Sequence, residues 1–466
     1  MPASPYPLAG EARDVVDDVR RLGGFGIVAH PDSPKRELRW RDWSLPVDGV
    51  ELLNPDTGWR VWAQEAAGKS SADAPDRWRA RGRLTAALVA YPFRSPETIA
   101  SLMLLGTAAV EHWAELAAGR RVVAIAGIDA HARIDWQGDG ADPSRALALP
   151  GYEPSFETLS VHITPDGPFT GSAQADAAGL LRAIRNGHLY AAVDGFATPP
   201  SFEFSATNDR GTVHEGDVLT TGGPVTLRVR SNAPPSFTAT VWNGATVMSA
   251  DHHEPAFTLT APAGPGVYRV EIRAPGKAHA ASWLRSNPIY VRPPEEPPPT
   301  PARPAAANVQ PIFSGDVAGW RVEHDAASLA DVEAAPKENG GDLRFRYGLA
   351  GGAKGGQVAA LAFDAPYAFD TYDRLTVTMR ADRPMRVSIQ LRAATASQDR
   401  WQRSVYLDAT DRQQTVFFDD FTPVGATYSV APDLARIRSV LFVVDVTNTK
   451  PGASGRIWVR DALLGR

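Results

Sequence analysis

The stretch RPPEEPPPTPARPAAANVQP, residues 292–311, most limits what this chain can fold into. Proline has no backbone N–H and fixes φ, so a run this rich in proline continues neither a helix nor a sheet. It predicts a stiff, extended linker of the polyproline type over residues 293–311. At 466 residues the chain is also too long for a single hydrophobic core. We therefore expect several domains, with one boundary at this linker.

Residues 1–195 alternate between apolar, strand-like runs and helical patterns. Examples are EARDVVDDVRRLG before FGIVAH, and SPETIASLMLLGTAAVEHWAELAAG before RVVAIAGIDAH. Strands that alternate with helices indicate a parallel α/β sheet or barrel, in which functional groups gather at the carboxyl ends of the strands. The longer helical run is expected to form one helix over residues 95–119, with Ser95 as its N-cap and Gly119 at its end.

The rest of the chain has an all-β pattern. Between residues 196 and 292, short segments of period two, such as SFEFSAT and VTLRVRS, are separated by Gly/Pro turns and predict a small, Ig-like β-sandwich. Residues 312–466 carry longer segments, such as MRVSIQLRAA and SVLFVVDV, and predict a jelly-roll-like sandwich. The expected fold is therefore multidomain, with a partial α/β region followed by two all-β sandwiches.

Composition narrows the chemistry. The chain has no cysteine, so any metal must bind to His, Asp or Glu. A formal net charge of −5 without a long basic run gives no support for nucleic-acid binding. No stretch approaches the roughly 18 apolar residues of a membrane span. The start MPASPYPLAG lacks the charged and apolar regions of a signal peptide. As written, the sequence indicates a cytoplasmic protein, and a periplasmic or extracellular one if a signal lies upstream.

Two strand-like runs end in side chains that bind metals. GFGIVAH ends at His30, and VVAIAGIDAH ends at Asp129 and His131. Side chains at i and i+2 of a strand point to the same side, so Asp129 and His131 can address one point. A carboxylate beside an imidazole suits Zn, Mn or Fe, with an open position for water. We predict a divalent-metal site at His30, Asp129 and His131, and we assign no catalytic residue.

The segments GIVAHPDSP, DGVELLN and AIAGIDAHA resemble motifs of the PHP (polymerase and histidinol phosphatase) superfamily, in which AHP-type and GSDAH-type strand ends supply metal ligands. SFETLSVHI, LLRAIRNGHLYAAVDG and SNPIYV are further similar to a carbaryl-hydrolase-like branch with a β-domain behind the catalytic barrel. The resemblance covers roughly residues 10–292. It implies a distorted seven-stranded β/α barrel that holds two or three metals. His30, Asp129 and His131 match its ligand positions.

The chain departs from that family at its start. The family opens with a His-x-His strand end, and the ten histidines of this chain include no such pair. About four strands are expected before residue 195, which is short of seven. Residues 1–195 are therefore expected to be the C-terminal part of a PHP-type barrel whose first half is upstream or lost. We accordingly expect weakly held metal and little activity from this chain alone.

Four further residues are candidates for supporting a metal ligand or lining a pocket. Glu51 lies on a strand and could bond the second nitrogen of a ligand histidine, and Asn54 ends the same strand. His162 follows the ETLSV strand, and Asp32 follows His30 and could contact an anionic substrate. For each residue the structural alternative is an outward-facing, core or solvated side chain.

Two functions remain open. The first is a PHP-type, metal-dependent hydrolase that cleaves a phosphoester, ester or amide bond of a small substrate with metal-activated water. The second is a non-catalytic surface or polysaccharide-binding protein with a degenerate PHP domain, which binds a glycan through its C-terminal sandwich. Four aromatic residues of that sandwich are either a sugar-stacking face or part of its core. They are Trp320, Tyr372, Trp401 and Trp458.

Overall fold

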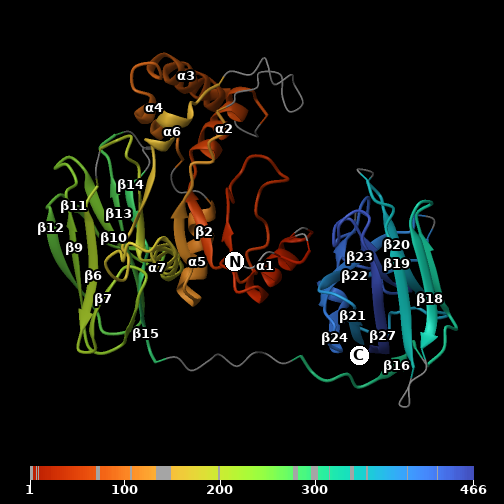
Figure 1. Ribbon diagram of the computed structural model, residues 1–466. Coiled ribbons are helices and arrows are strands. Elements are labelled where there is room, and N and C mark those ends of the chain that lie inside the picture. Colours follow the sequence, from red (N-terminus) through yellow and green to blue (C-terminus); the bar gives the residue numbers. More distant parts are fainter. Residues whose placement is uncertain are drawn as a thin grey trace. The chain divides into compact units, whose positions relative to one another are not determined.

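The computed structural model divides the chain into two compact units, Met1–Gly24 together with Pro299–Arg466, and Phe25–Pro298 (Figure 1). Most of the described elements are strands, so the chain is multidomain and rich in β-structure. In the described part of the chain, no helix is both long enough and apolar enough to cross a membrane. The described residues are 4–6, 8, 10–69, 74–104, 108–132, 148–197, 200–276, 282–294, 303–313, 315–335, 341–352, 355–395, 397–427 and 429–466.

The unit of residues 25–298 begins with a three-stranded parallel sheet. β1 (Ile27–Val28), β2 (Gly49–Leu53) and β3 (Val123–Ala126) lie in the order β1-β2-β3. The central strand β2 is buried at every position except Glu51, as expected of a parallel strand that is covered on both faces. Parallel strands need a long crossover connection, and the described part of the connection from β2 to β3 contains four helices. These are α2 (Pro55–Ala66), α3 (Ala74–Ala90), α4 (Ser95–Ser101) and α5 (Ala108–Gly119).

The prediction of one helix over residues 95–119 is wrong, because this stretch forms the two helices α4 and α5. Arg94, not Ser95, is the N-cap of α4. At its other end, the carbonyl of Leu102 accepts a hydrogen bond of 3.0 Å from Nε1 of Trp62 on α2. A tertiary contact is therefore made at the C-cap residue of α4.

The next two strands do not extend the parallel sheet. β4 (Ser160–Ile163) and β5 (Leu189–Ala192) pair antiparallel with each other, and β5 pairs with β14 (Ser282–Ser286) of the sandwich that follows. By sheet pairing, both strands belong to this sandwich. The helices of this stretch are α6 (Tyr152–Phe156) and α7 (Ala173–Asn186).

A two-sheet β-sandwich makes up the rest of this unit. One sheet has the order β11-β10-β13-β14-β5-β4, with β15 on β13 and β8 on β15, and the other has the order β12-β9-β6-β7. Alternate side chains, among them Phe204 and Val270, fill the space between the two sheets. Its further strands are β6 (Phe202–Asn208), β7 (Gly211–His214), β8 (Val218–Thr220), β9 (Val225–Ser231), β10 (Thr238–Asn243), β11 (Thr246–His252), β12 (Ala256–Ala261), β13 (Gly266–Arg273) and β15 (Ile289–Arg292).

The sandwich is joined to the parallel sheet along the edge of β3. The buried side chain of Asn287 accepts a hydrogen bond of 2.8 Å from the N–H of Ala124 and donates one of 2.9 Å to its carbonyl. Asn287 thus pairs with β3 as a neighbouring strand would. The Tyr290 hydroxyl accepts a further bond of 3.1 Å from the N–H of Val122. The α/β part and this sandwich are therefore joined by buried hydrogen bonds from side chains of the sandwich to the backbone of residues 122 and 124.

The other unit is a larger β-sandwich together with one N-terminal helix, α1 (Ala12–Arg21). One sheet has the order β18-β19-β27-β21-β24 with β16 on β27, and the other has the order β17-β20-β26-β22-β23-β25. Phe345, Phe369 and Phe442 are fully buried between them. Its elements are β16 (Val309–Pro311), β17 (Trp320–His324), β18 (Leu329–Ala335), β19 (Asp342–Gly348), β20 (Val358–Asp364), β21 (Arg374–Ala381), β22 (Met385–Ala393), β23 (Arg400–Leu407), β24 (Arg412–Phe417), η2 (Phe418–Asp420), β25 (Thr422–Pro423), β26 (Ile437–Asp445) and β27 (Ser454–Gly465).

The predicted strand-rich, multidomain architecture is confirmed. In the described residues the parallel sheet has three strands. The first 24 residues pack with the C-terminal sandwich, although the sequence pattern groups them with the α/β part.

Candidate metal centre

The predicted metal ligands follow the carboxyl ends of the parallel strands. His30 comes two residues after β1, and Asp129 comes three residues after β3. The central strand β2 leads directly into α2, so the first turn of that helix lies at the same edge of the sheet. In Figure 1 the helical region with α2, α3, α4 and α6 lies at this end of the strands. The carboxyl edge of a parallel sheet is the usual place for a functional site.

A cluster of three metal-binding side chains lies at this edge. One ligand atom each of Asp56, Asp129 and His131 lies within 4.8 Å of the other two. Nε2 of His131 is 3.2 Å from Oδ1 of Asp129. Two carboxylates and an imidazole form a donor set that divalent Zn or Mn accepts. We call these three residues the acid–histidine cluster. The structure thus brings Asp129 and His131 together and adds Asp56, which the sequence analysis did not single out.

His30 lies at the same edge and carries an unpaired nitrogen. Its Nδ1 is buried and, among the described residues, has no hydrogen-bond partner. Its backbone N–H donates to Oε2 of Glu51. A buried polar atom without a partner costs about 1–3 kcal/mol, so such an atom calls for an explanation. A cation bound at Nδ1 would supply the missing partner, but His30 does not belong to the acid–histidine cluster, in which Asp56 rather than His30 joins Asp129 and His131.

Glu51 and Asn54 support this edge rather than facing outward. Nδ2 of Asn54 donates a hydrogen bond of 3.0 Å to Oε2 of Glu51. Oδ1 of Asn54 caps α2 by accepting a hydrogen bond of 2.8 Å from the N–H of Thr57. Burial raises the pKa of Glu51, although the bonds from Asn54 and His30 act in the opposite direction. A Cβ at Gly127 would lie 1.8 Å from Oε1 of Glu51, so only glycine leaves room for this carboxylate.

The backbone of this region adopts conformations that only glycine adopts easily. The φ angles of His30, Asp129 and Ala132 are 33°, 48° and 47°. Each such residue costs on the order of 1–3 kcal/mol and persists only where its surroundings hold it. Two of the three are predicted metal ligands. Strain of this kind concentrates at ligand sites, and its presence here supports a functional edge.

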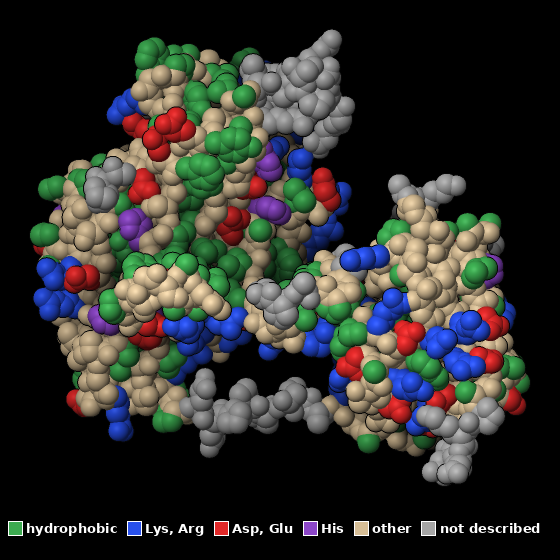
Figure 2. Space-filling view, in the orientation of Figure 1, with side chains coloured by type: hydrophobic (Ala, Val, Ile, Leu, Met, Phe, Trp, Pro, Cys, Tyr) green, Lys and Arg blue, Asp and Glu red, His purple; other side chains and the backbone are tan. Residues whose placement is uncertain are grey.

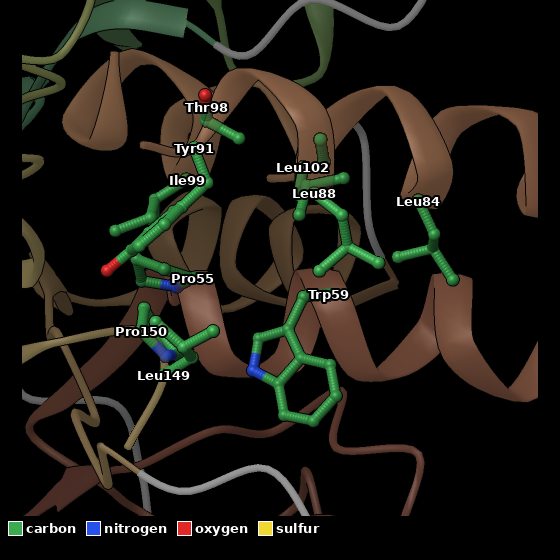
Figure 3. Close-up of a pocket in the computed structure, with 11 residues that line it drawn as sticks. Pro55, Trp59, Leu84, Leu88, Tyr91, Thr98, Ile99, Leu102, Leu149 and Pro150 are labelled. Atoms are coloured by element: carbon green, nitrogen blue, oxygen red, sulfur yellow. The ribbon is translucent and has the colours of Figure 1, made fainter. Parts of the chain in front are cut away.

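An apolar pocket adjoins the cluster on the side of α2 (Figure 3). Nε1 of Trp59 donates a hydrogen bond of 2.9 Å to Oδ1 of Asp56, and Nε of Arg60 also bonds that carboxylate. Asp56 is therefore held by α2 itself. The indole of Trp59 forms one wall of the pocket, which has a volume of about 90 Å³. The other lining residues are Pro55, Leu84, Ala87, Leu88, Tyr91, Thr98, Ile99, Leu102, Leu149 and Pro150.

Two other predicted pocket residues lie elsewhere. Both carboxylate oxygens of Asp32 accept from the N–H of Ala109, at 3.2 and 3.1 Å, so Asp32 caps the start of α5. His162 stacks on the ring of Tyr190 at 4.7 Å and its Nε2 is 3.0 Å from Oγ of Ser160. His162 lines an open depression on β4 that is separate from the apolar pocket beside Asp56.

The aromatic residues of the C-terminal sandwich do not form a shared stacking face. Trp320 and Trp401 are 7% and 3% exposed and belong to its core, and Tyr372 packs partly against that core. Trp458 lies beneath the guanidinium of Arg380, whose carbon is 3.8 Å from the ring centroid. Core packing, one of the two alternatives above, accounts for Trp320 and Trp401. Figure 2 shows that the surface of this sandwich is dotted with basic and acidic side chains.

Comparison with known proteins assigns no family to this chain. No family model and no curated protein matches the sequence. Among solved structures, the chain is similar to the family 11 carbohydrate-binding module of the cellulosomal cellulase Lic26A-Cel5E of Clostridium thermocellum, with 12% identity, a TM-score of 0.30 and coverage of 35% of this chain and 97% of that one. It is also similar to a family 29 module, CBM29-2, with 10% identity, a TM-score of 0.22 and coverage of 34% and 92%. An exo-beta-agarase matches with 10% identity, a TM-score of 0.22 and coverage of 33% and 25%. Similarity of this degree leaves the function to be argued from the residues.

Proposed function

We propose that this protein is a metal-dependent hydrolase of PHP type whose metal binds at the carboxyl edge of β1, β2 and β3. The observation that carries this proposal is the acid–histidine cluster, whose ligand atoms lie within 4.8 Å of one another. The unpaired, buried Nδ1 of His30 supports it. The resemblance of GIVAHPDSP and AIAGIDAHA to PHP motifs points to His30, Asp129 and His131 of this edge.

The protein's own residues have distinct tasks in this proposal. Asp56, Asp129 and His131 would hold a divalent ion, with His30 as a further ligand. Such an ion supplies a Lewis acid and lowers the pKa of water toward neutrality. Glu51 accepts a hydrogen bond from the backbone of His30, and Trp59 forms a wall of the apolar pocket beside Asp56. A phosphoester, ester or amide with an apolar group suits this arrangement.

Metal affinity tests the site directly. We expect the protein to bind Zn²⁺ or Mn²⁺, and we expect Asp56→Ala, Asp129→Ala and His131→Ala each to weaken binding on the order of tenfold or more, because each removes one ligand. Calorimetric titration of the chelator-treated protein measures the affinity, and mass spectrometry measures the metal content. His112→Ala is the matched control, since His112 is an exposed histidine on α5. Equal affinity in the wild type and the three cluster variants would mean that the metal binds elsewhere.

A second function, glycan binding by the C-terminal sandwich, is favoured by a row of polar side chains on one side of a sheet, of which Ser388, Gln390 and Ser404 are 3%, 2% and 7% exposed in this structure. On β22 and β23, the pairs Ser388–Ser404 and Gln390–Gln402 lie directly across from each other on one side of the sheet. Nε2 of Gln390 donates to Oε1 of Gln402 at 3.3 Å. Side-chain amides and hydroxyls are typical partners of sugar hydroxyl groups. We therefore propose polysaccharide binding as the alternative to hydrolysis, with a degenerate metal domain.

A panel of soluble polysaccharides tests this second function. We expect the full chain to be retarded in native gels that contain its ligand, and Gln402→Ala to reduce the retardation. Gln413→Ala is the matched control, because Gln413 is an exposed amide on β24 of the other sheet. The absence of retardation on every neutral and acidic polysaccharide would remove this alternative and leave the metal site unaffected.

A further inference from the structure

The helix α1 docks on the C-terminal sandwich through its acidic side rather than its apolar side. Asp14 and Asp18, one turn apart, are 4% and 1% exposed. In contrast, Val15, Val16 and Val19 of the same helix are only half-buried. A helix that packs on a protein core ordinarily buries its apolar stripe. The docking of α1 is therefore dominated by charge.

Two arginines of the sheet receive these carboxylates. Nε of Arg386 on β22 donates to both carboxylate oxygens of Asp18 at 2.9 Å, and its Nη1 donates to Oδ1 of Asp14 at 3.1 Å. Nη1 of Arg403 on β23 donates to the same oxygen of Asp14 at 2.8 Å. The Arg386 side chain is 5% exposed, so this is a buried, multidentate carboxylate site. One turn earlier, Glu11 bonds Gln402 at 3.2 Å.

The same face continues into uncharged polar groups. Arg386 lies across from Tyr406, and the next pairs along the two strands on this side are Ser388–Ser404 and Gln390–Gln402. This side of the two strands thus combines Arg386, which binds carboxylates, with amides and hydroxyls that suit sugar hydroxyls, and Arg403 reaches Asp14 from the neighbouring register position. An acidic polysaccharide carries both kinds of group.

The attachment of α1 is suited to release. A ten-residue helix is marginal in water by itself, so α1 depends on its docking. Its end is followed by Gly23, with φ of 70°, and Gly24, where the unit ends. Without α1, Arg386 and Arg403 would lose the carboxylates of Asp14 and Asp18 as hydrogen-bond partners. A competing carboxylate would restore those bonds.

We propose that Arg386 and Arg403 form a binding site for the carboxylates of an acidic, uronate-type polysaccharide, and that α1 occupies this site as an internal competitor. This inference rests on the second proposed function and narrows its ligand class. The carboxylates of Asp14 and Asp18 stand where those of the polysaccharide would bind. Binding requires α1 to leave. The apparent affinity is therefore the intrinsic affinity of the open site multiplied by the fraction of molecules in which α1 is undocked.

Affinity for polygalacturonate, measured with the full chain, tests this site. Asp14→Asn with Asp18→Asn weakens the docking of α1 and keeps both arginines, so the affinity should rise on the order of tenfold. Arg403→Gln should lower the affinity for polygalacturonate. This variant is used beside Arg386→Gln because Arg386 is more deeply buried than Arg403, so its substitution endangers folding. Arg344→Gln on β19 of the other sheet is the matched control. Added polygalacturonate should also speed tryptic cleavage at Arg20 and Arg21 as α1 leaves.

The other outcomes separate the inferences. Fully methyl-esterified polygalacturonate removes the charge and keeps the sugar, and equal binding of this polymer would overturn the arginine site while leaving glycan binding intact. Equal binding of polyglutamate would overturn the polysaccharide ligand class. Unchanged affinity in both the double Asp variant and Arg403→Gln would overturn the role of α1 and of Arg403 together. No binding of any polysaccharide by the wild type and the double Asp variant would overturn this inference and the second function alike.

Discussion

A buried ion pair in the first sandwich gives this chain a specific acid sensitivity. Glu271 on β13 is 3% exposed and accepts hydrogen bonds from Arg285 at 3.1 Å and from Arg273 at 3.2 Å. Burial acts to raise the pKa of Glu271, but Arg285, Ser282 and Arg273 outweigh it and lower that pKa from 4.5 to about 2. Because the pKa is lower in the folded than in the unfolded chain, the stabilisation is present above pH 4.5 and is lost as the pH falls toward 2.

Glu271→Gln should remove this stabilisation. We expect it to lower the free energy of unfolding at pH 7 by about 3–5 kcal/mol, since it leaves Arg285 buried without its carboxylate. Glu203→Gln, an exposed carboxylate that pairs with Arg230, should change it by less than about 1 kcal/mol. Urea unfolding at pH 7 and at pH 3 measures both, and the wild type should lose more stability on acidification than Glu271→Gln. Parallel losses in the two proteins would show that Glu271 does not titrate with folding.

At the level of single residues, the sequence predicted what local spacing can encode. Asp129 and His131 are two residues apart at a strand end, and the structure places both in the acid–histidine cluster. Asp56 joins them from a different strand end, through the first turn of α2. The pattern Asn54-Pro55-Asp56 does mark a helix start after a strand, and this signal could have included Asp56. The cap by Asp32 on α5 spans 77 residues, and spacing along the chain cannot reveal such a contact.

At the level of elements, the periodic spacing of apolar residues located most strands and helices, but it did not show which strands pair with each other. The sequence pattern identified β4 as a strand of the α/β part and did not single out β5, and pairing places both in the sheet of the sandwich through β14. The stretch 95–119, predicted as one helix, forms α4 and α5, and the carbonyl of Leu102 at the end of α4 bonds Trp62 on α2. Both places involve contacts between distant segments, which local propensity does not encode.

At the level of the whole molecule, the two compact units divide at Pro298 and Pro299 inside the proline-rich stretch, whose last residues form the strand β16 and not linker. Composition could not show that residues 1–24 return to the C-terminal sandwich. That association depends on the ion pairs of Asp14 and Asp18 with Arg386, which lie more than 360 residues apart in sequence. The acidic side of α1 is visible in the sequence, but its partner is not.

The α/β part should not fold without the sandwich that follows it. Ending the chain at residue 195 removes Asn287, which pairs with the edge of β3, and β14, which pairs with β5. It also uncovers Trp113 of α5, which is 1% exposed in the whole chain. The ring centroid of Trp113 lies 5.6 Å from Cζ of Arg269 on β13. An exposed strand edge beside an uncovered apolar surface promotes aggregation.

We therefore expect residues 25–298 to be soluble and to unfold in one cooperative transition, and residues 25–195 to aggregate. Size-exclusion chromatography with light scattering compares the two fragments, and calorimetry follows the unfolding of the longer one. In the longer fragment, Asn287→Ala should lower the free energy of unfolding by about 1–3 kcal/mol, because the N–H and carbonyl of Ala124 lose their buried partner. A monodisperse, cooperatively folded product from residues 25–195 would show that the α/β part is stable without the sandwich, and that the bonds of Asn287 join two independent domains.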